Sequence, residues 1–315
     1  MQTPVIVGVP CFNEEKNILH FLRSLEKQSS CISAVIISDD STDNTPNLVE
    51  KFARVSSLDV IFLHHCERRG AAAAWNEIFD GACRIAAEST SGTEALVLYD
   101  ADVIPSRDCT AQLASRVGKR HRADGRVVHI CASRPEPVQV DSIAARASAF
   151  ISDWLRHVRR SNEISKYTVM GRALAISTEA AERIRIPENL IAIDLYLQCK
   201  AIELGMALEY NDEAVVYFSP ASTIRDFASQ VLRSFRGHQQ LREHTARLDL
   251  NLTALDAVRA AVKAGLADPV GLVSAMVGYS LMPYYRAKLA GAASSALWDI
   301  AMSSKSVDTA PVFEE

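Results

Sequence analysis

Carboxylates, an asparagine and an arginine follow the short apolar runs in the first third of the chain. These residues are Pro10, Asn13 and Glu14 after the first run, Asp39, Asp40 and Asp43 after the second, Arg69 after the third, and Asp100 and Asp102 after the fourth. In an open parallel sheet, ligands bind beyond the carboxyl ends of the strands. If these runs are strands, the sequence predicts a charged site at one sheet edge, suited to a phosphorylated ligand with a metal.

Asp100 and Asp102 are separated by one residue at the end of the fourth run. Alternate residues of a strand point to the same face, so both carboxylates are expected on one side. Two negative charges this close are unfavourable unless a cation or proton intervenes. Their oxygens suit Mn²⁺ or Mg²⁺, with substrate phosphates completing the shell, so we predict a metal here. Asn13, Glu14 and the Asp39–Asp43 segment have a simpler alternative, because these residue types also favour helix caps and turns.

Strands and helices must alternate to position these groups. The predicted strands are Val5–Val9, Ala34–Ser38, Asp59–His64, Ala95–Tyr99 and Val127–Ser133, with helices around Ile18–Leu25 and over Ala71–Glu88. This alternation implies an α/β fold with a doubly wound, mostly parallel sheet. Neither a Gly-x-Gly-x-x-Gly motif after the first strand nor a P-loop motif occurs, which argues against dinucleotide dehydrogenases and P-loop NTPases.

The second half of the chain is less regular. We predict helices over Ser142–Arg160, Asp194–Leu204 and Thr223–Arg247, and strands over Met170–Ser177 and Ala214–Phe218. We expect residues 1–222 to form the catalytic domain and residues 223–315 a helical C-terminal region. Pro269–Tyr285 has no charged residue, but it is shorter than the roughly 20 apolar residues that span a bilayer.

Composition narrows the functional class. Of the 315 residues, 48% are hydrophobic and 23% charged, which excludes a disordered, collagen-like or coiled-coil chain. The formal net charge of −4 argues against a nucleic-acid partner. Seven scattered cysteines without a Cys-x-x-Cys pair favour a reducing compartment over a disulfide framework or zinc site. Because the N-terminus lacks a basic region and a cleavage site, we expect a cytoplasmic protein.

Taken together, the motifs resemble those of the family 2 glycosyltransferases in order and spacing, most closely over the first 105 residues. The matching segments are Pro10–Glu15, Asp39–Asp43, Arg69–Gly70 leading to Asn76, Asp100–Asp102, Gly171–Ile176, Ile193–Asp194 and Gln230–Arg233. The resemblance implies the GT-A fold and an inverting transfer. In that reaction an acceptor hydroxyl attacks the anomeric carbon on the face opposite a nucleotide diphosphate.

The resemblance also implies residue roles. Asp194 would be the general base, although helix capping is the alternative for it. Asp102 would hold Mn²⁺ or Mg²⁺, and Asp100 would assist the metal or bind the ribose. The remaining donor-binding residues would be Asp40, which accepts hydrogen bonds from the nucleotide base, together with Pro10, Asn13, Glu14 and Arg69.

A basic row follows on the long helix predicted after Thr223. Gln230, Arg233 and Arg236 are spaced three apart and share one helical face, where they would close over the diphosphate or the acceptor. A solvated basic face is the alternative. His238 is a candidate for a further metal ligand, although a lone histidine more often has another role.

Two departures from the family pattern favour a single addition over a processive synthase. Ile193 stands where the family commonly has a glutamate, and Ser234 replaces the tryptophan of the processive enzymes. Two other classes remain open. A phosphatase of the haloacid dehalogenase class also uses Asp-x-Asp, but on its first strand, and a non-catalytic nucleotide-sugar-binding protein would need the same pocket. A nucleotidyltransferase would need a glycine-rich loop where Pro10–Asn13 stands.

The substrates are less sharply defined. A UDP-sugar is the first candidate for the donor and a GDP-sugar the second, with a lipid-linked or small-molecule hydroxyl as acceptor. Two basic clusters, Arg116–Arg126 and Arg156–Arg160, could seat the protein on anionic lipid together with Pro269–Tyr285. Ordinary surface charge and a packed helix pair are the alternative to this peripheral membrane contact.

Overall fold

The computed structural model describes residues 4–89, 95–121, 125–161 and 172–288. Its strands are β1 (Val5–Cys11), β2 (Ile32–Asp39), β3 (Val60–His64), β4 (Ala95–Tyr99), β5 (Val103–Pro105), β6 (Val128–Pro137), β7 (Ala173–Ser177) and β8 (Ala207–Phe218). In this part of the chain they form one eight-stranded sheet in the order β3-β2-β1-β4-β7-β6-β8-β5. β7 and β5 run against the other strands, so the sheet is mixed but mostly parallel, as predicted.

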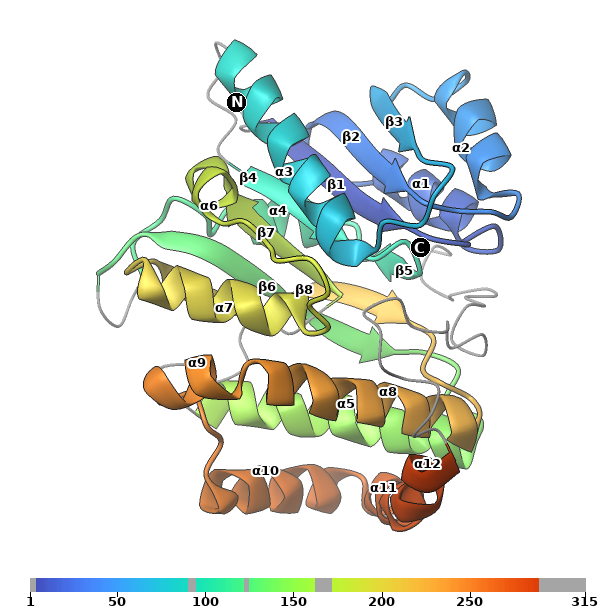
Figure 1. Ribbon diagram of the computed structural model, residues 1–315, viewed down its shortest axis with the longest axis vertical. Coiled ribbons are helices and arrows are strands. Elements are labelled where there is room, and N and C mark those ends of the chain that lie inside the picture. Colours follow the sequence, from blue (N-terminus) through green and yellow to red (C-terminus); the bar gives the residue numbers. More distant parts are fainter. Residues whose placement is uncertain (1–3, 90–94, 122–124, 162–171, 289–315) are drawn as a thin grey trace.

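Helices flank this sheet on both faces (Figure 1). They are α1 (Ile18–Glu26), α2 (Thr45–Ala53), α3 (Ala71–Glu88), α4 (Cys109–Ala114), α5 (Ile143–Ser161), α6 (Thr178–Arg183), α7 (Ile193–Glu203), α8 (Ile224–Gln240), α9 (Arg242–Arg247), α10 (Ala254–Ala267), α11 (Pro269–Ser280) and α12 (Met282–Lys288). Gly171 of the predicted motif, Arg122 of a basic cluster and the residues after Lys288 lie outside the described residues.

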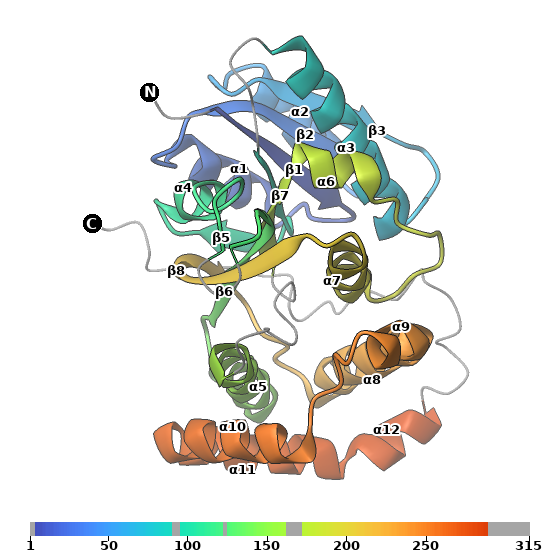
Figure 2. The same ribbon diagram turned by 90° about the vertical axis from the view of Figure 1, so that its left-hand side faces the viewer.

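Side-chain alternation along the strands divides the core into two layers. Val5, Val7 and Val9 pack with α1, α2 and α4 on one face, whereas Ile6 and Ile36 pack with α3, α6 and α7 on the other. Figure 2 shows these two groups of helices on opposite sides of the sheet. Both faces are buried, which is why the strands read as continuous apolar runs rather than as alternating ones.

The C-terminal helices form a separate layer beyond the sheet with α5 (Figures 1 and 2). A third apolar cluster holds this layer together, with Phe150 of α5, Phe227 of α8, Ala264 of α10 and Ala275 of α11. No helix among the described residues combines the length and the apolar character needed to cross a membrane.

Two elements differ from the sequence-based prediction. The helix predicted over Thr223–Arg247 is interrupted at Leu241, which separates α8 from α9. The strand predicted over Ala214–Phe218 begins earlier, at Ala207 of β8. The uncharged Pro269–Tyr285 stretch forms two helices, α11 and α12, with Leu281 between them.

Candidate active site

The loops that follow β1 and β2 are joined by hydrogen bonds. The backbone N–H of Asn13 donates to Ser41 Oγ at 2.7 Å, and Asn13 Oδ1 accepts from the Thr42 N–H at 2.8 Å. Asn13 has a φ of 55°, a left-handed conformation that asparagine tolerates better than most residues. The Glu14 N–H donates to Thr45 Oγ1 at 2.8 Å. These bonds fix a rim at the end of β1, the strand that also carries Pro10.

Asp40 ties the loop after β3 to this rim. Its buried carboxylate accepts the backbone N–H groups of Arg69 at 2.7 Å and Gly70 at 2.9 Å. The Arg69 guanidinium lies 3.4 Å from the same carboxylate through Nε and donates to Glu77 at 2.7 Å through Nη2. Burial alone would raise the pKa of Glu77, but the hydrogen bonds from Arg69 and Ser38 outweigh it and lower that pKa. Asp40 therefore organises the loop that carries Arg69.

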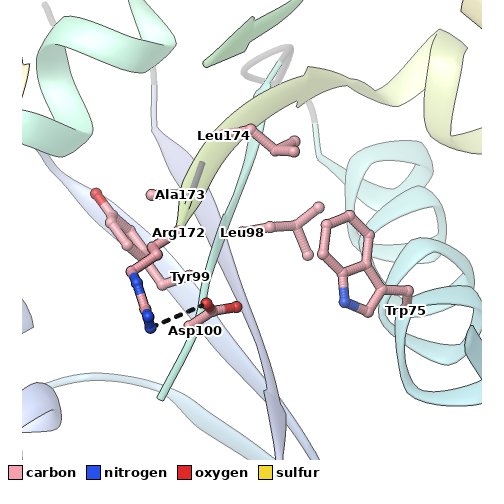
Figure 3. Close-up of a pocket in the computed structure, with 7 residues that line it drawn as sticks. All are labelled: Trp75, Leu98, Tyr99, Asp100, Arg172, Ala173 and Leu174. Atoms are coloured by element: carbon pink, nitrogen blue, oxygen red, sulfur yellow. Dashed lines mark ion pairs between the residues drawn. The ribbon is translucent and has the colours of Figure 1, made fainter. Parts of the chain in front are cut away.

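Asp100 and Asp102 meet an arginine that the sequence did not single out. Arg172 Nη1 lies 3.2 Å from both carboxylate oxygens of Asp102 and 3.8 Å from Asp100 Oδ2. A small hollow beside Asp100 is lined by Trp75, Leu98 and Arg172. Figure 3 shows these residues and the ion pair between Arg172 and Asp100. The predicted pair of carboxylates thus converges on one cation.

The electrostatics around Asp100 connect it to two further predicted residues. The Asp100 side chain is about half-exposed, yet partial desolvation raises its pKa above the usual carboxyl range. The negative charge of Asp102 acts in the same direction, and so does that of Glu14, whereas Arg172 and Arg233 oppose the shift. The charges of Glu14 and Arg233, two residues far apart in sequence, therefore both reach Asp100 at the end of β4.

Asp194 lies in the first turn of α7, and its Oδ1 accepts the Leu195 N–H at 2.9 Å. Burial raises the pKa of Asp194. The hydrogen bond from the Leu195 N–H and the positive charges of Arg233 and Arg159 oppose that rise without cancelling it. A carboxylate with a raised pKa in a site of opposite charges is a candidate general base. Capping explains little of its position, because its hydrogen bond reaches only the next residue.

Helix α8 is held against the segment before Asp194 by close packing. A Cβ added to Gly237 would lie 2.6 Å from Ala192 Cβ, so glycine allows the approach. The Gln240 side chain accepts from the Ile191 N–H at 2.9 Å and donates to the Asn189 carbonyl at 3.1 Å. This contact brings Arg233, one turn before Gly237, to the site.

The other predicted residues of this helix are placed less directly. Gln230 and Arg236 are half-buried on α8, and their contact with a ligand stays a prediction. The His238 ring bonds the Ser234 carbonyl through Nδ1 at 2.8 Å. Within the described ranges, no three His, Cys, Asp or Glu side chains form a group that could hold one ion, and a metal-ligand role for His238 stays a prediction.

The sequence analysis gave no role to several residues that shape the site. Asn76 belongs to a matching motif, and its side-chain amide accepts the Ile186 N–H at 2.9 Å and donates to the Ile186 carbonyl at 2.8 Å, which fixes the segment leading to Asp194. Arg172 directly precedes β7, and no local sequence pattern indicated that this strand lies antiparallel beside β4. Arg159, from a predicted basic cluster, is buried at 5% exposure rather than presented to a membrane.

The carboxylate oxygens of Asp100 and Asp102 are suited to bind a divalent cation. Asp100 and Asp102 offer hard oxygen ligands. The positively charged Arg172 guanidinium lies beside both carboxylates, which shows that the pair accommodates a positive charge. Mg²⁺ and Mn²⁺ are commonly bound by one or two carboxylates plus substrate phosphates. Two protein carboxylates are therefore enough when the phosphates come from a nucleotide.

Comparison with known proteins decides the family. Residues 6–175, more than half of the chain, match the family described as Glycosyl transferase family 2. The chain belongs to this family. As a member of it, the protein is classed as a glycosyltransferase. The match does not favour a phosphatase or a non-catalytic binding protein, and Asp100–Asp102 follow the fourth strand, not the first.

Solved structures agree on the fold. A mannosyltransferase from Pyrobaculum calidifontis, in complex with GDP-Man and Mn²⁺, is 22% identical with a TM-score of 0.54, covering 92% of this chain and 76% of that one. Residues 1–349 of S. aureus TarS, in complex with UDP, are 18% identical with a TM-score of 0.51, covering 91% of this chain and 92% of that one. This glycosyltransferase therefore has the predicted GT-A architecture.

One curated relative has higher local identity. An uncharacterized protein of Methanocaldococcus jannaschii is 41% identical over 70 residues, which is 22% of this chain. The match spans 30% of the length of that relative.

Proposed function

We propose that this glycosyltransferase performs an inverting, single addition of a sugar to an acceptor hydroxyl. The observation that carries the proposal is the position of Arg233, whose charge acts on both Asp100 and Asp194. Because the charge of one arginine reaches both groups, we place the base and the donor-binding pair at one substrate site. An inverting transfer needs one base to take the hydroxyl proton, and Asp194 is that group.

Each residue has a defined task in this proposal. Asp194 removes the proton of the acceptor hydroxyl, and burial raises its pKa, which makes it a stronger base. General-base catalysis of this kind contributes about 10²–10⁴-fold in rate. Arg233 neutralises charge that develops on the departing diphosphate, and Arg69 contributes at the nucleoside end. Asp100 and Asp102 would hold Mn²⁺ or Mg²⁺, which supplies Lewis-acid stabilisation of the leaving group when bound. Such electrostatic stabilisation is often the largest part of catalysis.

The donor is proposed to be a UDP-sugar, with a GDP-sugar second. Pro10, Asn13, Glu14 and Asp40 surround the rim where the nucleoside would bind. Asp40 accepts the two backbone N–H groups on Oδ2, whereas its Oδ1 makes longer contacts, at 3.4 Å from Arg69 Nε and from His65 Nδ1. These longer contacts leave Oδ1 capacity to accept a hydrogen bond from the nucleotide base. Single addition is supported by Ser234, which follows Arg233 in place of an aromatic ring.

We also propose that residues 223–315 include a lipid-facing surface next to the catalytic part in residues 1–222, so that a lipid-linked acceptor fits as well as a small molecule. Helices α10–α12 expose many large apolar side chains, among them Leu266 at 80%, Met276 at 64% and Tyr284 at 60%. The exposed cations Arg259, Lys263, Arg286 and Lys288 accompany them. An apolar surface flanked by cations suits an anionic membrane interface on the cytoplasmic side.

Vesicle binding tests this surface. The wild-type protein should sediment with phosphatidylserine vesicles. The double variant Leu266→Asp/Met276→Asp should stay in the supernatant. Val55→Asp is the matched control, since Val55 is 85% exposed but lies after α2. Equal vesicle binding by wild type and both variants would refute the lipid-facing role of this surface. If the wild-type protein forms a dimer that only the double variant loses, the surface binds a second copy of the chain instead.

Thermal unfolding with UDP, GDP, CDP and dTDP tests the donor site, each with Mn²⁺, Mg²⁺ or EDTA. A ligand at 100 times its Kd should add about 2.7 kcal/mol of stability. We expect one nucleotide to stabilise the protein only with metal, and Asp102→Asn to abolish the effect. Asp108→Asn, at an exposed aspartate without a capping bond, should behave as wild type. If no nucleotide stabilises the protein, the site assignment fails.

A further inference from the structure

Arg172 is fixed at the aspartate pair from three directions. Its carbonyl accepts the Asp100 N–H at 3.0 Å. Its guanidinium lies against Asp102 at 3.2 Å and stacks over the Phe218 ring at 4.2 Å. The side chain is only 22% exposed. A planar cation held by two carboxylates and an aromatic face is a built arrangement, not a chance surface contact.

Arg172 uses the atoms that a divalent cation needs. Both oxygens of Asp102 face the same nitrogen, Nη1, and Asp100 Oδ2 lies 3.8 Å from it. An ion coordinated by these oxygens would come within a few ångströms of the guanidinium, where two positive charges repel strongly. The metal and Arg172 therefore cannot share the pair in the present arrangement.

We propose that Arg172 is an internal cation that occupies the metal position of the Asp100–Asp102 pair and is displaced when a divalent ion binds. The inference rests on the metal-dependent donor site proposed above. Phe218 provides the second anchor that keeps the displaced guanidinium beside the site. Metal without nucleotide must then compete with Arg172, whereas a bound diphosphate adds oxygen ligands and negative charge. Metal and nucleotide are thus expected to strengthen each other's binding.

Direct measurement of Mn²⁺ binding, without nucleotide, tests this competition. Free Mn²⁺ is followed by its electron paramagnetic resonance signal during titration of wild type and Arg172→Gln. We expect Arg172→Gln to bind Mn²⁺ at least tenfold more tightly than wild type. Adding Asp102→Asn to that variant should remove the gain. Arg185→Gln is the matched control, because Arg185 pairs with Asp80 away from the site, and its affinity should not change.

A second variant keeps the test valid if Arg172→Gln does not fold. Phe218→Leu removes the stacking partner but leaves Arg172 in place, so Mn²⁺ affinity should rise by a smaller factor. Mn²⁺ affinity that is unchanged or weaker in the folded variants would overturn the inference. The proposed function has a separate readout. If wild type consumes no nucleotide sugar while Arg172→Gln still gains Mn²⁺ affinity, the proposed function fails and the inference on Arg172 stands.

Discussion

Replacing Asp194 with asparagine should move activity and stability in opposite directions. Asparagine keeps an oxygen that can accept the Leu195 N–H, now 2.9 Å from Asp194 Oδ1, so the start of α7 should be preserved. It cannot take a proton from the acceptor. Burial raises the pKa of Asp194, which means that the ionised carboxylate costs folding free energy at pH values above its folded pKa. The neutral amide of the variant would not carry that cost.

The expected loss of rate follows from general-base catalysis. A factor of about 10²–10⁴ in kcat corresponds to about 3–5 kcal/mol in the activation barrier, at about 1.4 kcal/mol for each tenfold change. At pH 7 the variant should also unfold at a higher temperature than wild type. In wild type, kcat/KM should rise with pH along an acid limb lying above the ordinary aspartate range, because the base must be deprotonated.

Donor turnover and thermal unfolding, measured on the same preparation, test the expected fall in kcat and the expected rise in unfolding temperature. Asp226→Asn is a useful control, since Asp226 is also in a first helical turn but belongs to α8. Full activity in Asp194→Asn would refute the base assignment. A variant that lost activity and also melted earlier would show that Asp194 supports the fold, and the argument from its burial would fail.

Further predictions concern the site rim, the core and the pH dependence of stability. Asp40→Ala leaves two backbone N–H donors without their acceptor, so urea unfolding should show a loss of about 2–3 kcal/mol, with a smaller loss for Asp40→Asn. Gly8→Ala places a Cβ 2.4 Å from Ile78 Cγ2, and overpacking of this kind should cost about 1–3 kcal/mol in the same assay. The hydrogen bond from Lys200, helped by the neighbouring cations, outweighs burial and lowers the pKa of Glu203 from 4.5 to about 2. The folded state should therefore lose stability as pH falls from about 4.5 to 2, and Glu203→Gln should flatten this part of the curve in thermal unfolding.

The sequence alone determined the fold class and supplied most of the residues that we propose for donor binding. Short apolar runs such as Val5–Val9 appear as strands because a sheet buried on both faces leaves no polar positions in its centre. Asp40 and Asp100 could be predicted at one sheet edge because parallel strands end at a common edge, and they directly follow β2 and β4, which both run parallel to β1. Asp194 was found through the resemblance, since a helix-starting aspartate has no distinctive local pattern.

Only the tertiary structure decided which cations meet these carboxylates. Arg172 faces Asp100 because β7 runs antiparallel between β4 and β6, and the choice of strand partner depends on contacts far apart in sequence. Arg233 reaches the site because Gly237 allows α8 to approach Ala192 closely. Periodicity reports which face of an element is buried, but not what lies against it. The carboxylates were therefore visible in the sequence, whereas their counter-ions depended on long-range packing.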